Sequence, residues 1–280
     1  MSDTEGIPNS RDSTVCRGWY SRGYLPHFDE TGVVQHITYH LGDSILQCYH
    51  EELQRKLDAL PQDQKDLERR KHLQQLLDNG YGSCLLRNDH YAKIVDDAFL
   101  FGDQTRYKLL AWVVMPNHIH VLIQQLKGWP LAKVVQSWKR HTSRQIHLLQ
   151  QRSCSLGDRS CTPISSSFLG QRSCTTSSSS STSALWQIDY WDRFIRDASH
   201  YNIAINYIIS NPVKAGLIDK PENWRWSSAW SGWENAGYGK RALNMPVYNA
   251  NRSVDTYRGV SNGSGCFSVK EEMLEYESVM

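Results

Sequence analysis

Apolar residues recur along this sequence with two different periods, and their order predicts the elements of an α+β domain. Runs of β-branched and aromatic residues predict strands at 33–41, 106–115 and 118–124. Apolar positions three or four residues apart predict helices at 45–60, 61–79, 89–101, 131–150 and 199–211. Pro61 marks the start of the second helix, and Pro212 is expected to end the last one.

One internal stretch, 151–183, breaks these periods. It repeats Gln-Arg-Ser-Cys and continues into a run of Ser and Thr, so it contains too few apolar residues to offset its ordering entropy. We expect a disordered insertion inside a single domain that spans 17–233. We expect a flexible tail at 1–16 and a weakly ordered tail at 234–280. The aromatic and basic segment 17–29, punctuated by Gly and Pro, is typical of an ordered loop or arm.

Composition narrows the class of protein. Of the 280 residues 40% are hydrophobic and 11% aromatic, which excludes wholesale disorder. Seven cysteines without a CxxC pair argue against a disulfide framework and a thiolate zinc module. Apolar runs fall short of the roughly 20 residues that a membrane helix needs, and the amino terminus is too polar for a secretory signal. We therefore expect a soluble cytoplasmic protein that does not contact a membrane.

The formal charge of +2 conceals a basic block. Residues 104–157 include eight Lys and Arg and neither Asp nor Glu. Such a block is typical of a protein that binds a polyanion, because phosphate contacts release counterions; a solvated helix face is the alternative. The candidate phosphate contacts are Lys133, Lys139, Arg140 and Arg144 on the predicted helix 131–150, and Lys214 after the last helix.

Two histidines supply candidate chemistry. His118 and His120 alternate with Ile119 on a predicted strand, so their side chains project from one face about 6–7 Å apart. Two imidazoles placed in this way can chelate one divalent cation. Hydrogen-bonded or surface histidines are the alternative interpretation.

Tyr207 and Asn211 lie one helical turn apart, on nearly the opposite side from the apolar stripe of the predicted helix 199–211. A solvent-facing tyrosine is the simpler explanation of Tyr207 alone. Together with the histidines, however, these residues supply the parts of a phosphodiester transesterification. The two imidazoles and the Asn211 amide oxygen would hold Mg²⁺ or Mn²⁺, and the Tyr207 phenol would attack the phosphate, leaving DNA covalently attached to the protein. No nucleotide cofactor is needed because the bond energy is kept.

The motif Pro116-Asn117-His118-Ile119-His120 resembles the HUH motif of single-tyrosine transposases, and Tyr207-Ile-Ile-Ser-Asn211 resembles their nucleophile helix. More particularly, the sequence is similar to the REP-associated tyrosine transposases, which are encoded beside repetitive extragenic palindromes in bacteria. The segments that carry the likeness are 21–29, 111–120, 190–197, 207–217 and 224–228.

This resemblance implies a ferredoxin-like (RRM-like) antiparallel sheet, with the histidine pair on a central strand and helices on one face. It also implies cleavage of single-stranded DNA at palindromic hairpins through a 5′-phosphotyrosine, with possible strand transfer, by a monomer or homodimer at the bacterial nucleoid. By position, the residues that would recognise the foot of the hairpin are Arg22, Gly23, Tyr24 and His27; a purely structural arm is the alternative.

Two other functions remain open at this point. One is a domesticated binder of hairpin DNA or RNA with a vestigial catalytic site. The other is a metal phosphodiesterase that uses water in place of Tyr207.

Overall fold

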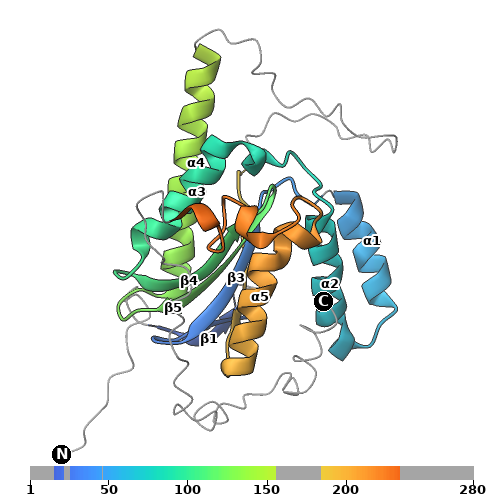
Figure 1. Ribbon diagram of the computed structural model, residues 1–280. Coiled ribbons are helices and arrows are strands. Elements are labelled where there is room, and N and C mark those ends of the chain that lie inside the picture. The colour runs from blue at the N-terminus through green and yellow to red at the C-terminus, as the bar shows by residue number, and fades with distance from the viewer. Residues whose placement is uncertain (1–15, 22–25, 46, 156–183, 234–280) are drawn as a thin grey trace, which may run out of the picture.

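The computed structural model describes residues 16–21, 26–45, 47–155 and 184–233. Its centre is a four-stranded antiparallel sheet in the order β4-β5-β3-β6 (Figure 1). The strands are β3 (Val34–His40), β4 (Tyr107–Val114), β5 (His118–Gln125) and β6 (Trp191–Phe194). Because β5 pairs with both β4 and β3, the histidine pair lies on a central strand, as expected.

The chain follows the order β3-α3-β4-β5-α4-β6, which is the ferredoxin-like βαββαβ path. Helices α3 (Asp89–Gly102) and α4 (Leu131–Ser155) pack on one face of the sheet. Their main partners are the odd-numbered residues of the two central strands, Ile37, Tyr39, Ile119, Val121 and Ile123. The expected α+β class and the ferredoxin-like core are therefore confirmed.

A third helix, α5 (Ala198–Lys214), covers the other face of the sheet, so the expectation of helices on one face holds only for α3 and α4 (Figure 1). All seven residues of β3 are buried, which is the result of packing on both sides. The second face combines apolar residues with the polar ones that β3 and β5 point toward α5. Its apolar members include Val34, Ala111, Val113 and Leu122 from the strands, with Tyr201, Ile205 and Ile208 from α5.

A helical hairpin lies between β3 and α3. It consists of α1 (Gln47–Asp58) and α2 (Gln62–Asp78), which bury a small leucine core of Leu53, Leu57, Leu73, Leu76 and Leu77. The turn after α2 needs a glycine at Gly82, because φ there is +85° and a Cβ would lie 2.6 Å from the carbonyl oxygen of Asp43. This hairpin brings the end of α2 against the start of β5.

The amino-terminal arm is a two-stranded hairpin of β1 (Gly18–Ser21) and β2 (Pro26–Asp29), where the sequence predicted an ordered loop. Exposed Trp19 packs against Phe28 at a ring-centroid distance of 5.1 Å, which joins the two strands on one side. Three short 3-10 helices complete the fold: η1 (Leu85–Arg87), η2 (Pro221–Asn223) and η3 (Ser231–Trp233).

Two helices run further than the sequence predicted. Helix α4 continues to Ser155, five residues into the predicted insertion. Helix α5 passes through Pro212 to Lys214, because a proline in the last turn removes only one N–H and the Ala215 N–H still bonds to the Asn211 carbonyl at 2.9 Å. The rest of the predicted insertion and both predicted tails lie outside the described residues, apart from Cys16. No helix within the described residues is long and apolar enough to cross a membrane.

Candidate active site

The histidine pair and Tyr207 meet between the sheet and α5. His118 and His120 are buried on the sheet face that α5 covers, with their ring centroids 4.9 Å apart. The Tyr207 ring approaches from α5, and its centroid is 5.2 Å from that of His120. One chain therefore brings together the three residues that the sequence singled out on separate elements.

Hydrogen bonds orient both imidazoles in the same sense. Nδ1 of His118 bonds to the Asn117 side-chain oxygen at 2.7 Å, and Nδ1 of His120 bonds to the Thr38 hydroxyl at 2.8 Å. Nδ1 of His120 also lies 3.2 Å from Nε2 of His36. The Nε2 atoms of His118 and His120 are buried and have no hydrogen-bond partner among the residues that the structure describes. An Nδ1–H donor leaves the Nε2 lone pair directed into the site, as a metal ligand requires.

Burial keeps these rings neutral. It lowers the pKa of His118 to about 3, with a further contribution from His40. It also lowers the pKa of His120 well below 6.5, with His118 and His36 acting in the same direction. Neutral imidazole is the form that coordinates metals, so the site needs no proton removal at neutral pH.

Asn211 is buried one turn after Tyr207, and its side-chain amide donates to the Tyr207 carbonyl at 3.0 Å. This hydrogen bond uses the side-chain nitrogen of Asn211. The side-chain oxygen, which the sequence predicted as a metal ligand, does not take part in it. The buried side of α5 is wider than the predicted apolar stripe. Tyr201, Ile205 and Ile208 of the stripe are buried, and so are His200, Ala204, Tyr207 and Asn211. The hydrophobic periodicity did not predict burial of His200, Tyr207 and Asn211, because a hydrophobic pattern assigns polar residues to the solvent-facing side of a helix.

Two charged residues lie at the edge of the site. The Asp78 carboxylate, at the end of α2, is 3.9 Å from Nε2 of His118. The Lys214 ammonium lies 5.1 Å from the centroid of the Tyr207 ring. Burial raises the pKa of Asp78, although the Gln74 hydrogen bond and the Lys214 charge act against it. A small cavity of about 90 Å³ opens beside Asp78 and Asn117.

Within the described ranges, no three or more His, Cys, Asp or Glu side chains form a ready-made metal site. A cation at the histidine pair therefore requires a donor of another kind, such as the Asn211 oxygen, or a side-chain movement. The feature of the site that suits a metal ion is the pair of buried Nε2 atoms of His118 and His120, which have no hydrogen-bond partner in the described part of the chain.

Sequence reasoning missed the β3 contribution. His36, Thr38 and His40 alternate with Ile37 and Tyr39, so they share the face of the histidine pair. The alternation was visible in the sequence, but only the pairing of β3 with β5 shows that Thr38 stands opposite His120. Asp78 had no sequence signal, because it belongs to a helix inserted outside the core.

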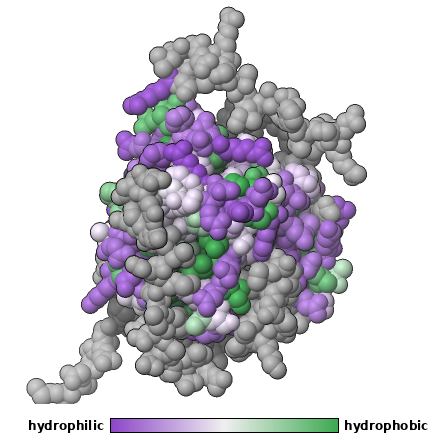
Figure 2. Space-filling model, in the orientation of Figure 1, coloured by the Kyte–Doolittle hydropathy of each residue, from purple (hydrophilic) through white to green (hydrophobic). Residues whose placement is uncertain are grey.

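Three of the four candidate phosphate contacts on α4 fit a surface role. Arg140 and Arg144 are exposed and Lys133 is half-buried, and Figure 2 shows hydrophilic side chains gathered where α4 rises from the domain. Lys139 does not fit. Its ammonium donates to the carbonyls of Gln187 and Asp189 at 3.0 and 2.6 Å, so it fastens α4 to the segment before β6.

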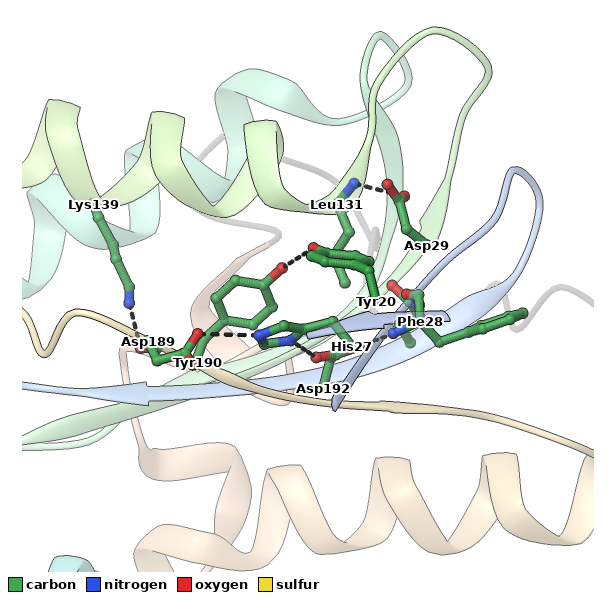
Figure 3. Close-up of polar contacts among 10 residues, drawn as sticks. Tyr20, His27, Phe28, Asp29, Leu131, Lys139, Asp189, Tyr190 and Asp192 are labelled. Atoms are coloured by element: carbon green, nitrogen blue, oxygen red, sulfur yellow. Dashed lines mark hydrogen bonds and ion pairs between the residues drawn. The ribbon is translucent and has the colours of Figure 1, made fainter. Parts of the chain in front are cut away.

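His27 also differs from its predicted role as a DNA contact. Its ring is completely buried, with Nδ1 bonded to Asp192 and Nε2 to Asp189 at 3.1 Å (Figure 3). Both ring nitrogens are therefore engaged, and the ring fastens β2 to β6. Burial lowers its pKa, but the two carboxylates outweigh this and raise the pKa to about 9. Arg22, Gly23 and Tyr24 lie outside the described residues.

Part of this chain is similar in sequence to known transposases. Residues 87–156 match the family described as Transposase IS200 like. The REP-associated tyrosine transposase of Escherichia coli K12 is 23% identical over 122 residues, which cover 44% of this chain and 54% of that protein. A second relative, from Haemophilus influenzae, is 25% identical over 122 residues and is matched over 58% of its length. This chain thus spans a little over half the length of both relatives.

A solved structure described as the REP-associated tyrosine transposase bound to a REP hairpin is 16% identical, with a TM-score of 0.40. The alignment covers 86% of this chain and 97% of that one. The family match includes the His118–His120 motif, on which the sequence resemblance rested. The chain is therefore similar in sequence to the REP-associated tyrosine transposases, and its residues 87–156 match the IS200-like transposase family.

Proposed function

We propose that this protein is a metal-dependent transposase or endonuclease that cleaves single-stranded DNA beside palindromic hairpins. Tyr207 attacks the scissile phosphate and forms a 5′-phosphotyrosine, which releases a 3′-hydroxyl. The phosphotyrosine keeps the energy of the broken bond, so a second strand end can replace the tyrosine and complete strand transfer. Relatives named for this activity support the proposal.

One observation carries the proposal. The Tyr207 ring lies beside that of His120, within a site where two buried imidazoles direct unpartnered nitrogens inward. Tyr207 is only 6% exposed and packs against His120, so it is not the solvent-facing tyrosine of the simpler explanation. An unpaired buried polar atom costs about 1–3 kcal/mol, and a bound cation would satisfy both Nε2 atoms at once.

The residues divide the work in the following way. Nε2 of His118, Nε2 of His120 and the Asn211 oxygen would hold Mg²⁺ or Mn²⁺, which supplies charge neutralisation at the phosphate when bound. Thr38 and Asn117 hold the two rings in the ligand orientation. The Lys214 ammonium, close to the Tyr207 ring, favours both the phenolate and an approaching phosphate.

Basic residues of α4, which packs on the sheet face opposite the histidine pair, would contact DNA away from the cleavage site. Lys133, Arg140 and Arg144 on α4 offer phosphate contacts, which give affinity without sequence information. Recognition at the foot of the hairpin is assigned to Arg22, Gly23 and Tyr24. Since the nucleophile and the histidine pair come from one chain, a monomer is sufficient for the site. A protein with this function would act at the bacterial nucleoid.

The test is covalent capture. The full-length chain is incubated with Mn²⁺ and a labelled hairpin oligonucleotide that carries a single-stranded flank, and the mixture is analysed by denaturing electrophoresis. We expect a labelled protein band that requires Mn²⁺ and is absent in Tyr207→Phe, because phenylalanine has no oxygen nucleophile. Tyr201→Phe is the matched control, since Tyr201 is a buried tyrosine on the same helix. His120→Ala should bind the hairpin and fail to cleave it.

Each alternative has its own outcome. An adduct in the Tyr207→Phe variant would show that another residue is the nucleophile. Cleavage without any adduct would indicate a phosphodiesterase that uses water. Hairpin binding with neither product nor adduct would indicate a binding module with a vestigial site.

A further inference from the structure

We propose that the Asp78 carboxylate is a further ligand of the cation at His118 and His120, an inference that rests on the proposed function. Asp78 is the last residue of α2, in the helical hairpin that is inserted between β3 and α3. The inserted hairpin would thus complete a site that the ferredoxin-like core and α5 otherwise provide.

The distance between Asp78 and His118 is the first argument. The Asp78 carboxylate oxygen lies 3.9 Å from Nε2 of His118, which is too far for a hydrogen bond. Two ligand atoms that are each about 2.1 Å from the same cation lie roughly 3–4 Å apart. Nε2 of His118 is fully buried and has no other partner in the described part of the chain, and its separation from the Asp78 oxygen falls within the range expected for two ligands of one cation.

The position of Asp78 is held by the same residue that orients His118. The Asn117 amide donates to the carbonyls of Leu77 and Tyr81, both at 3.1 Å, while its oxygen bonds to Nδ1 of His118. Asn117 therefore joins the end of α2 to the first histidine.

The stability of α2 does not explain why an acidic residue occupies position 78. Asp78 puts a negative charge at the carboxyl end of a 17-residue helix, where the helix dipole disfavours it. Its carboxylate accepts from Gln74 at 2.7 Å, a bond that an asparagine would also make. The simplest rival explanation is that Asp78 only balances the charge of Lys214.

A modest movement is needed. As they lie, Asp78, His118 and His120 do not form a closed ligand set, so the carboxylate must turn toward the cation. The Asp78 side chain is 35% exposed and lines a small cavity together with Asn117, so it is not tightly packed on all sides.

The experiment measures binding of Mn²⁺ alone to the full chain, by titration calorimetry and by the loss of the paramagnetic resonance signal of free Mn²⁺. We expect Asp78→Asn to weaken Mn²⁺ binding about tenfold or more while thermal unfolding stays unchanged or improves. The matched control is Asp58→Asn: Asp58 accepts the same type of bond, from Gln54 at 2.8 Å, on the exposed side of α1.

Asp78→Asn separates the two explanations, because it leaves Mn²⁺ affinity unchanged if Asp78 only balances the charge of Lys214. Lys214→Met tests the ligand role from the other side: it removes a repulsive charge, and a loss of Mn²⁺ affinity in this variant would contradict the inference. Wild-type affinity in Asp78→Asn, with binding lost in His120→Ala, overturns this inference alone. Wild-type affinity in His120→Ala, or no binding by the wild type, overturns the metal site of the proposed function as well.

Discussion

His120 illustrates how far a single residue can be interpreted from sequence. Its pairing with His118 on one face of a strand follows from alternation, and its proximity to Tyr207 was a geometric expectation that the structure meets. Its orientation depends on Thr38 and His36, which are 82 and 84 residues away. No local pattern could have revealed that dependence, because it arises from the register between β3 and β5.

Thr38 therefore offers a test of orientation without loss of a ligand. Thr38→Val keeps the shape of the side chain and removes the hydroxyl that bonds to Nδ1 of His120. We expect Mn²⁺ binding and adduct formation to weaken about tenfold, because the ring loses the partner that fixes its tautomer. Nitrogen-15 NMR of the imidazole should show mixed tautomers. Thr105→Val, at an exposed threonine, is the control. Unchanged Mn²⁺ affinity in Thr38→Val would leave His36 as sufficient to orient the ring.

At the scale of elements, the sequence predicted the five α-helices of the described residues and the strands β3, β4 and β5, but not β1, β2 or β6. Two of its errors share one cause. The arm was interpreted as a loop although it pairs as β1 and β2, and α5 was ended too early at Pro212. In both places the outcome depends on contacts from elsewhere in the chain: His27 bonds β2 to Asp189 and Asp192, and Tyr207 of α5 packs against the sheet. Local propensity does not contain those contacts.

Helix α5 begins at a cap that can be tested separately. The Asp197 side chain accepts from the His200 N–H at 2.8 Å, which satisfies one of the free donors of the first turn. We expect Asp197→Ala to lower the free energy of unfolding by about 1 kcal/mol, measured by urea denaturation at pH 7.5. Asp197→Asn should retain most of that stability because asparagine also caps helices. If the alanine variant is as stable as the wild type, the cap contributes nothing to the helix that carries Tyr207.

At the scale of the whole molecule, the fold class was predictable and the use of both sheet faces was not. Strand periodicity shows that β3 and β5 have two different faces, one apolar and one containing histidines. A polar face is normally assigned to solvent. Here it is buried beneath α5, and the cost of burying its polar groups is offset by the bonds among His36, Thr38 and His120. A buried polar face between a sheet and a helix is the feature of the whole fold that most strongly supports the proposed site.

The stability of the whole domain should also depend on pH through His27, which joins the arm to the sheet. The pKa of His27 is about 9 in the folded state, against about 6.5 in an unfolded chain. Its contribution is complete below pH 6.5 and is lost as the pH rises toward 9, because only the folded state keeps the proton in that window. We expect the wild type to lose between about 1 and 3 kcal/mol of unfolding free energy from pH 6.5 to 9 through this group.

His27→Gln should be less stable at pH 6.5 and should lose this part of the pH dependence, whereas His90→Gln, at an exposed histidine, should follow the wild type. The low pKa values of His36, His118 and His120 act in the opposite direction and below pH 6.5, so they do not obscure the effect. Parallel pH profiles for His27→Gln and the wild type would mean that the proton on His27 does not hold the arm in place.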